Sequence, residues 1–216
     1  MSEPFDPGRQ RVETLSLDRP TLEQVAHVAT EAFVDDPFFV FLSPNRRLRR
    51  RGLHIYFRGA VGCLGERGVV LGVRGEGGRL VGVAAFVKPD GYPLPVSAQL
   101  RQALAALWAL LPRPPALVDG SRYLWAIDKA HPRERLWYLE LLAVDPSLQR
   151  RGIGGALQEH LYQQADRDQL PSYLETQKEE NLAYYRRFGY ELVSELRPVR
   201  RGPPLWTMRR EPRPAS

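Results

Sequence analysis

Cysteine is the scarcest of the reactive residues in this sequence. Cys63 is the single cysteine among 216 residues, which excludes an internal disulfide bond and a thiolate metal cluster and agrees with a reducing compartment. It stands in an apolar helical pattern, which favours a buried structural thiol over a nucleophile. The four histidines show no metal-ligand spacing among themselves. We therefore expect neither a metal site nor an acyl-cysteine intermediate.

Long apolar runs are also missing. The longest, such as residues 103–111, fall short of the roughly 20 residues that a membrane span requires, and residues 1–4 lack a basic-then-apolar signal. We therefore expect a cytoplasmic protein without a membrane partner. The length favours one domain, expected at residues 12–210, between a disordered N-terminus at residues 1–11 and a tail at residues 211–216.

The basic segments lack interleaved aromatic residues. The formal net charge of +6 could suggest binding to nucleic acid, because clustered Arg and Lys neutralise phosphates. Much of this charge lies in the arginines of residues 46–51 and in those near positions 200 and 210, without the pattern of a base-stacking platform. We interpret the two groups as a solvated helix face and a basic tail, and we expect no nucleic-acid partner.

A glycine-rich turn is the most informative feature that is present. An apolar run from Leu139 ends at Asp145–Pro146, and Gly152–Gly155 then lead into a helical pattern. Such a turn directs successive backbone N–H groups at one spot in front of a helix N-terminus, which favours binding of a phosphate or pyrophosphate. The turn lacks the Gly-Lys-Ser/Thr end of a Walker loop, and Leu157 stands where a dinucleotide fingerprint needs its third small residue.

The spacing of this turn fits neither of these two loops, but it matches the signature of a known family. Segment Gln149–Gly154 resembles the Q/R-x-x-G-x-G/A signature of the GCN5-related N-acetyltransferase (GNAT) family. Farther along, Tyr173–Thr176, then Asn181, and then Tyr185-x-x-x-Gly-Tyr are similar to the family's next strand and helix. The resemblance implies an α/β domain with the GNAT (acyl-CoA N-acyltransferase) fold, in which helices flank a central mixed β-sheet. It also implies acetyl-CoA as co-substrate and an amine as acceptor.

The resemblance further implies which residues hold acetyl-CoA. In the family, the strand before the turn hydrogen-bonds the pantetheine arm, the turn holds the pyrophosphate, and an asparagine at the next helix start contacts the cofactor. The residues at these positions are Leu142, Ala143, Val144, Gln149, Arg150, Arg151, Gly152, Ile153, Gly154, Gly155 and Asn181. For Asn181, a plain role as a helix N-cap stands beside this one.

Three residues are candidates for proton transfer. Tyr185 occupies the position of the family's general acid, and a phenol can protonate a thiolate, although a helix-to-strand junction would also bury it as core. Glu140 interrupts an apolar strand and Glu175 ends the next one, so either could serve as general base. The alternatives are a salt-bridged carboxylate and a simple strand-end acid, and the sequence does not choose between the two glutamates.

An aromatic and acidic cluster follows the first expected helix. Its members are Phe33, Asp35, Asp36, Phe38, Phe39 and Phe41. The cluster could receive a cationic amine, or its phenylalanines could pack the core. The wider layout is similar to that of puromycin N-acetyltransferases, which favours the primary amine of a small molecule over a protein lysine or N-terminus.

Since no cysteine is placed to accept an acyl group, we expect direct attack in a ternary complex. A non-catalytic acyl-CoA sensor is the alternative from another class. The oligomeric state stays open, with a homodimer among the alternatives.

The apolar periodicity predicts the order of the secondary-structure elements. Helices are expected at residues 21–33, with a capping box at Thr21 and Gln24, and at residues 48–64, 98–111, 117–130, 156–167 and 181–188. Strands are expected at residues 69–73, 80–87, 136–144, 173–175, 190–196 and 205–209. The first helix is expected to stop at Asp36–Pro37, and a turn at residues 43–45 to precede the second.

Overall fold

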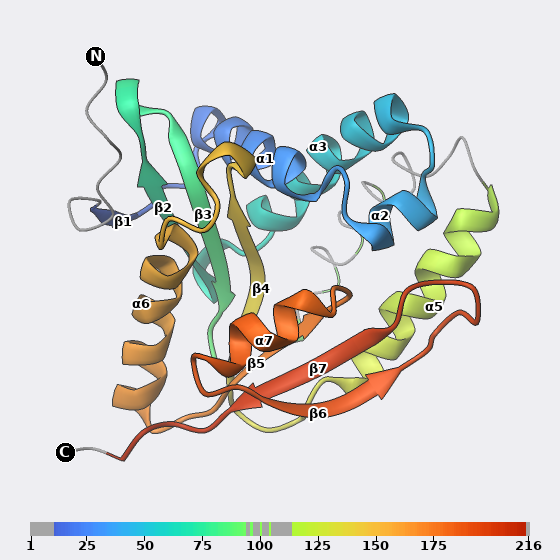
Figure 1. Cartoon of the computed structure of the whole chain (residues 1–216). Coiled ribbons are helices and arrows are strands. Elements are labelled where there is room, and N and C mark those ends of the chain that lie inside the picture. Colours follow the sequence, from blue (N-terminus) through green and yellow to red (C-terminus); the bar gives the residue numbers. More distant parts are fainter. Residues whose placement is uncertain (1–10, 94–95, 97–99, 101–103, 105–113, 215–216) are drawn as a thin grey trace.

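The computed structural model describes residues 11–93, 96, 100, 104 and 114–214. Within them, a seven-stranded sheet crosses the molecule (Figure 1). Its strands, in their order across the sheet, are β1 (Val12–Thr14), β2 (Gly68–Arg74), β3 (Leu80–Val87), β4 (Trp137–Val144), β5 (Ser172–Thr176), β7 (Leu205–Arg210) and β6 (Glu191–Leu196). Neighbouring strands are antiparallel except β4 and β5, which are parallel. This mixed sheet confirms the predicted fold class.

Helices cover both faces of the sheet. α1 (Arg19–Phe33) and α3 (Arg46–Gly62) pack on one face, and α6 (Ile153–Asp168) packs on the other. α2 (Pro37–Leu42) contacts α5 (Pro114–Ala130), and α7 (Glu180–Arg186) follows β5. The helix expected at residues 98–111 lies almost entirely outside the described residues. Among the residues that are described, no helix is both long and apolar enough to span a membrane.

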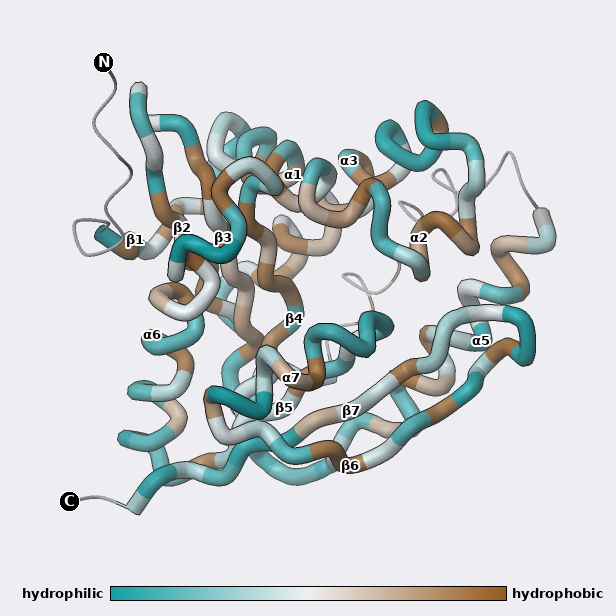
Figure 2. Tube along the Cα trace, viewed as in Figure 1, coloured by the Kyte–Doolittle hydropathy of each residue, from teal (hydrophilic) through white to brown (hydrophobic). Residues whose placement is uncertain are grey.

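The core consists of two apolar layers, one on each side of the sheet. Val25 and Phe57 belong to the layer under α1 and α3, and Leu157 and Leu161 belong to the layer under α6. Every residue of β3 is buried, because its side chains alternate between the two layers. Figure 2 shows the hydrophobic segments concentrated along β3 and β4 at the centre of the view.

The predicted helices in the described part of the chain begin one to three residues earlier than the sequence indicates, and the structure explains the start of α1 and of α6. Asp18 caps α1, and its Oδ1 accepts a hydrogen bond from the N–H of Thr21 at 2.8 Å. The predicted capping box at Thr21 is therefore wrong, because Pro20 fits the first helical turn and the helix starts farther upstream. α6 begins at Ile153 rather than at residue 156, since Gly152 forms its cap with φ 85°.

The sequence does not predict α2. Its N-cap is Asp36, whose Oδ1 accepts a hydrogen bond from the N–H of Phe38 at 2.9 Å. Pro37 stands at the first helical position, where its missing N–H costs nothing. A helix as short as α2, made almost only of apolar residues, has no amphipathic period to detect. The consequence is a short aromatic helix where the sequence indicated only the end of the preceding one.

β4 and β5 pair only at their beginnings. The register joins Trp137 to Ser172 and Tyr138 to Tyr173, and the later residues of the two strands are not paired with each other. Such a separation leaves backbone groups and side chains inside the sheet open to a ligand.

A bulge lies in β4 next to this separation. Leu139 lies opposite Phe86 and Leu141 lies opposite Ala85, so Glu140 is an extra residue without a partner on β3. A bulge of this kind interrupts the alternation of the strand and redirects a side chain. The acidic residue that interrupts the apolar strand in the sequence is thus the bulged residue of the structure.

Candidate active site

A cavity of 530 Å³ lies where β4 and β5 separate. We call the residues that β4, β5 and α7 contribute the sheet part of its lining: Tyr138, Leu139, Glu140, Leu141, Leu142, Glu175, Thr176, Asn181 and Tyr185. The helical part comes from α1, α2, α3 and α5 and is mainly aromatic and aliphatic. The volume falls in the range of small-molecule sites, about 300–1,000 Å³.

The glycine-rich turn lies at the far end of β4. Asp145 turns the chain there, with its Oδ1 accepting a hydrogen bond from the N–H of Ser147 at 3.0 Å. Arg150 and Gly152 then have positive φ angles of 61° and 85°, and no side chain among the described residues caps α6. The first N–H groups of α6 therefore have no intrahelical acceptor and point out of the helix, which is an arrangement that binds an anion.

Gly154 lets α7 approach the start of α6. A Cβ atom at Gly154 would lie 2.8 Å from the hydroxyl of Tyr184. This hydroxyl accepts a hydrogen bond from Nε2 of the fully buried Gln158 at 2.7 Å, and Gln158 accepts one from Tyr162. The two helices are thus fixed to each other directly behind the turn.

The unpaired edge of β4 connects the turn to the cavity. The N–H of Asp145 donates to the carbonyl of Val81 at 2.8 Å, and in an antiparallel pair such bonds recur at every second residue, so the backbone of Ala143 also faces β3. The backbone groups of Leu142 and Val144 therefore point to the opposite side, into the separation. An extended ligand can bind there as an additional strand would.

The polar residues of the turn are exposed. The side chain of Gln149 donates from Nε2 to the carbonyl of Val144 at 3.2 Å and so closes the turn onto the strand. Arg150 and Arg151 are exposed and lie next to the unpaired N–H groups, whereas Ile153 is buried under β3. The positive charges of these two arginines lie beside the turn and favour an anion there.

Asn181 lies inside the first turn of α7, which begins at Glu180. Its Nδ2 donates a hydrogen bond to Oγ1 of Thr176 at 2.9 Å. The interpretation of Asn181 as an N-cap is therefore wrong, since Glu179 holds the cap position. Asn181 instead ties α7 to the end of β5 and lines the cavity.

Glu140 is partly buried in the cavity wall. Burial raises the pKa of Glu140 to about 7, and the negative charge of Glu175 adds to this rise. A hydrogen bond with the hydroxyl of Tyr138 favours the ionised form and opposes the rise. A carboxyl group with such a pKa can accept a proton and release it again near neutral pH.

The side chain of Glu175 is 5% exposed. Its Oε1 lies 3.8 Å from Nδ1 of the equally buried His131, and neither atom has a hydrogen-bond partner among the described residues. The ring of His131 stacks on Tyr92 with centroids 3.8 Å apart and lies edge-on to Tyr138. No sequence pattern points to His131, because it follows α5 and reaches Glu175 only in the folded chain.

Tyr185 is buried and lines the cavity. Its ring packs edge-on against Tyr184 and Tyr190, with centroids 5.2 and 5.8 Å apart. Burial raises the pKa of Tyr185, and these two tyrosines raise it further. The hydroxyl therefore holds its proton at neutral pH. Tyr185 packs in the core and also lines the cavity, so both of its expected environments are present.

The aromatic and acidic cluster divides in the fold. Phe33, Asp36, Phe38 and Phe39 line the cavity, whereas Asp35 and Phe41 do not. The side chain of Asp35 is 66% exposed and pairs with Arg46 at 3.2 Å.

Asp36, by contrast, is buried, and its Oδ2 lies 3.5 Å from Nζ of Lys178. Burial raises the pKa of Asp36, and the positive charge of Lys178 opposes that rise.

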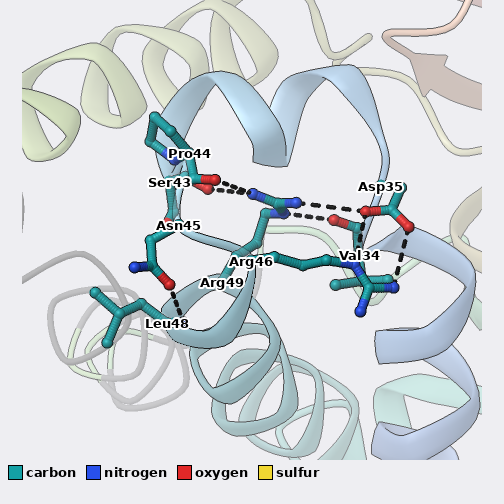
Figure 3. A network of polar contacts seen from close by, with 8 residues as sticks. All are labelled: Val34, Asp35, Ser43, Pro44, Asn45, Arg46, Leu48 and Arg49. Atoms are coloured by element: carbon teal, nitrogen blue, oxygen red, sulfur yellow. Dashed lines mark hydrogen bonds and ion pairs between the residues drawn. The ribbon is translucent and has the colours of Figure 1, made fainter.

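Arg49 is a structural residue that the sequence does not reveal. Its guanidinium group donates to the carbonyls of Val34, Ser43 and Pro44 and reaches Asp35 at 3.4 Å (Figure 3). Arg49 is 5% exposed, so the interpretation of residues 46–51 as a uniformly solvated face is wrong at this position. One buried cation thus holds together the ends of α1 and α2, both of which contribute to the cavity wall.

The parallel strands that separate beside a glycine-rich helix start define an acyl-CoA-dependent acyltransferase fold. A model of the acetyltransferase (GNAT) family matches residues 35–190, and the chain belongs to this family. It is therefore an N-acetyltransferase with acetyl-CoA as co-substrate, as the sequence predicted.

Solved structures with the same fold have low sequence identity to this chain. One is a Corynebacterium glutamicum protein described as "histone acetyltransferase HPA2 and related acetyltransferase". It is 21% identical, with 96% of this chain and 98% of that chain covered and a TM-score of 0.67. The polyamine N-acetyltransferase of Drosophila melanogaster is 15% identical, with 94% and 99% covered and a TM-score of 0.54. The ribosomal-protein-S18-alanine N-acetyltransferase of Escherichia coli is 16% identical, with 96% of each chain covered and a TM-score of 0.53.

Proposed function

We propose that the protein transfers the acetyl group of acetyl-CoA to the primary amine of a small molecule, by direct attack in a ternary complex. The observation that supports this most is the single cavity whose lining includes both the open edge of β4 and two carboxylates beside an aromatic wall. Phe38 of α2 contacts Tyr123 of α5 with ring centroids 4.7 Å apart, so rings from two helices lie side by side in the helical part. A cavity of 530 Å³ suits a small-molecule acceptor.

The backbone of the turn and of β4 would hold the co-substrate. The unpaired N–H groups after Gly152 suit the pyrophosphate, and the open edge at Leu142 and Val144 suits the amide-containing pantetheine arm. The N–H of Leu142 can donate a hydrogen bond to the thioester oxygen as that oxygen gains negative charge. Asn181 lines the same path and is placed to contact the arm.

Glu140 would act as the general base. An aliphatic amine reaches the site as an ammonium ion, and only the neutral amine can attack the thioester carbonyl. The carboxylate of Glu140, with a pKa near 7, can take up this proton directly or through one water. Glu175 would support the base by keeping the pKa of Glu140 raised.

Tyr185 would protonate the departing thiolate. When nitrogen forms its bond to the acetyl carbon, the bond from that carbon to sulfur breaks and sulfur leaves with the electron pair. The raised pKa of Tyr185 keeps a proton on its hydroxyl for this step. The nitrogen loses two protons in all. Glu140 takes the first, from the ammonium ion, and releases it to solvent, and the second, lost after the C–N bond forms, restores the proton that Tyr185 gave to sulfur.

The substitution Tyr185→Phe tests the proposal. We expect acetyl-CoA binding, measured by calorimetric titration, to be kept and amine acetylation, measured by release of free thiol, to fall roughly ten- to a hundredfold. Tyr92→Phe is a matched control, because the Tyr92 hydroxyl bonds to the exposed Asp128 at 3.0 Å and Tyr92 does not line the cavity. A wild-type chain that binds acetyl-CoA but acetylates no amine would instead be a sensor.

A further inference from the structure

The helical part of the cavity is an aromatic wall. Phe33 of α1, Phe38 and Phe39 of α2, and Phe57 of α3 all line it. Their rings contact one another at tilted or edge-on angles, as between Phe39 and Phe57 at 6.0 Å, and Tyr123 of α5 continues the wall beyond Phe38. Ring edges and faces of this kind bind a flat or bulky apolar body and offer little to a polar chain.

The acidic groups of the cavity are not equally available to a cation. Asp36 lies within the helical part, but Lys178 and the N–H of Phe38 already match its charge at 3.5 and 2.9 Å. Glu140 and Glu175 lie together in the sheet part and repel each other. One ammonium group at the sheet part would relieve that repulsion. A second cation farther along the acceptor would meet a carboxylate that is already paired, and the attraction of the aromatic rings for a cation would replace only part of the hydration that it loses.

A substrate carboxylate would find no suitable cation among the described residues that line the cavity. Among the described lining residues Arg49 is the one cationic side chain, and its guanidinium group is bound to the carbonyls of Val34, Ser43 and Pro44. An anionic group would therefore remain unpaired and face two carboxylates, which opposes its binding.

From these three observations we infer that the acceptor is a monoamine with an aromatic or similarly bulky apolar body, without a carboxylate and without a second cationic group. The ammonium end lies at Glu140 and Glu175, and the apolar body lies between α2, α3 and α5. The inference rests on the proposed function and specifies its substrate class.

Two matched pairs of acceptors test each part of the inference with the full chain. Phenethylamine and phenylalanine differ by one carboxylate, and butylamine and 1,4-diaminobutane differ by one terminal amine. With saturating acetyl-CoA and free thiol as the readout, we expect kcat/KM to be highest for phenethylamine. Phenylalanine should be at least a hundredfold poorer, since its carboxylate stays unpaired, and 1,4-diaminobutane roughly tenfold poorer than butylamine.

A substitution in the wall locates the apolar body. Phe38→Ala removes a ring that lines the cavity, and it should raise KM for phenethylamine about tenfold while changing that for butylamine less than about threefold. Val40→Ala is the matched control on the same helix, since Val40 is exposed and does not line the cavity. It should leave both KM values unchanged.

The outcomes separate the inference from the function on which it rests. If 1,4-diaminobutane matches or exceeds butylamine, or if phenylalanine matches phenethylamine, the substrate class is wrong and the small-molecule acetyltransferase stands. If Phe38→Ala affects both amines equally, the placement of the ring is wrong. If the chain binds acetyl-CoA but acetylates none of the four acceptors, the inference and the proposed small-molecule acceptor both fail.

Discussion

The two halves of the proposed site are built in different ways. The proposed cofactor side, which comprises β4, the turn after it and the start of α6, is one continuous stretch at residues 137–155 that presents mainly backbone groups. The proposed acceptor side combines α1, α2, α3 and α5 with the end of β5, and it presents side chains. On this proposal, backbone groups would bind the co-substrate that the family shares, while side chains would set which amine is accepted.

This difference explains why the two halves can change independently. Substitution of a side chain on the acceptor side leaves the N–H and C=O groups of β4 in place. The cofactor side in turn depends on a few positions where the backbone itself is special, such as Gly152 with its positive φ. Glu140 belongs to both halves, because the bulge that contains it lies on β4 and its carboxylate lines the cavity.

The largest effect is expected at this shared residue. Glu140→Gln should lower kcat roughly a hundred- to a thousandfold and leave the acetyl-CoA affinity nearly unchanged, since a positioned base contributes on that order. In the wild-type protein, kcat/KM should rise with pH through about 7, because the raised pKa of Glu140 keeps its carboxyl protonated and unable to accept a proton below that pH. The variant should lose this inflection.

Two further variants check this prediction. Glu191→Gln, at an exposed position of β6, should leave the pH profile unchanged. If Glu175→Gln instead abolishes the inflection and Glu140→Gln keeps it, the base is Glu175.

The second prediction concerns a substitution that perturbs the acceptor side alone. Arg49→Met should lower the free energy of unfolding by about 2–4 kcal/mol, because buried carbonyls at the ends of α1 and α2 lose their donors. Below the unfolding transition, acetyl-CoA should bind to this variant as to the wild type, whereas the KM for the amine should rise.

Denaturant unfolding measures the change in the free energy of unfolding, and Arg50→Met is the control. Arg50 follows Arg49 but is exposed and pairs with Glu31 at 2.7 Å, so its loss should cost less than about 1 kcal/mol. Equal destabilisation by the two variants would contradict the role assigned to Arg49.

The third and smallest effect concerns the cofactor side alone. Gly152→Ala should weaken acetyl-CoA binding about ten- to a hundredfold, because a Cβ atom disfavours the positive φ and shifts the N–H groups of the turn. Gly77→Ala is the matched control, since Gly77 also has a positive φ, at 68°, and lies in the turn between β2 and β3. Both variants should lose similar stability, but only the first should change the affinity in a calorimetric titration.

Local pattern was sufficient for most of the fold. Residues 80–87 are apolar, residues 137–144 are apolar except for Glu140, and these segments become the strands β3 and β4. The glycines after Leu148 begin α6. The cap of α1 was missed because Asp18 and Thr21 both favour a helix start and only Pro20 decides between them. α2 was missed because its apolar residues have no polar face by which a helix is recognised.

The candidate site could be predicted only where its residues act through neighbours in the chain. The turn and Asn181 follow from spacing, but the actual bond of Asn181 to Thr176 does not. Glu140 stands out as an acid in an apolar strand, yet the bulge depends on how β3 pairs with β4. The sequence does not indicate the contacts of His131 with Glu175 or of Lys178 with Asp36, because the two residues of each pair come from separate segments of the chain.

The sequence by itself determined the family, the co-substrate and the position of the glycine-rich turn. Backbone geometry over a few residues depends on local glycines and on the strand before them. Only the tertiary structure decided which carboxylates share the cavity, which arginine is buried and which aromatic rings form the wall. The physical reason is that burial and pairing of charges are set by elements far apart in the chain. A pKa or a specificity arises from those neighbours, and no single segment contains them.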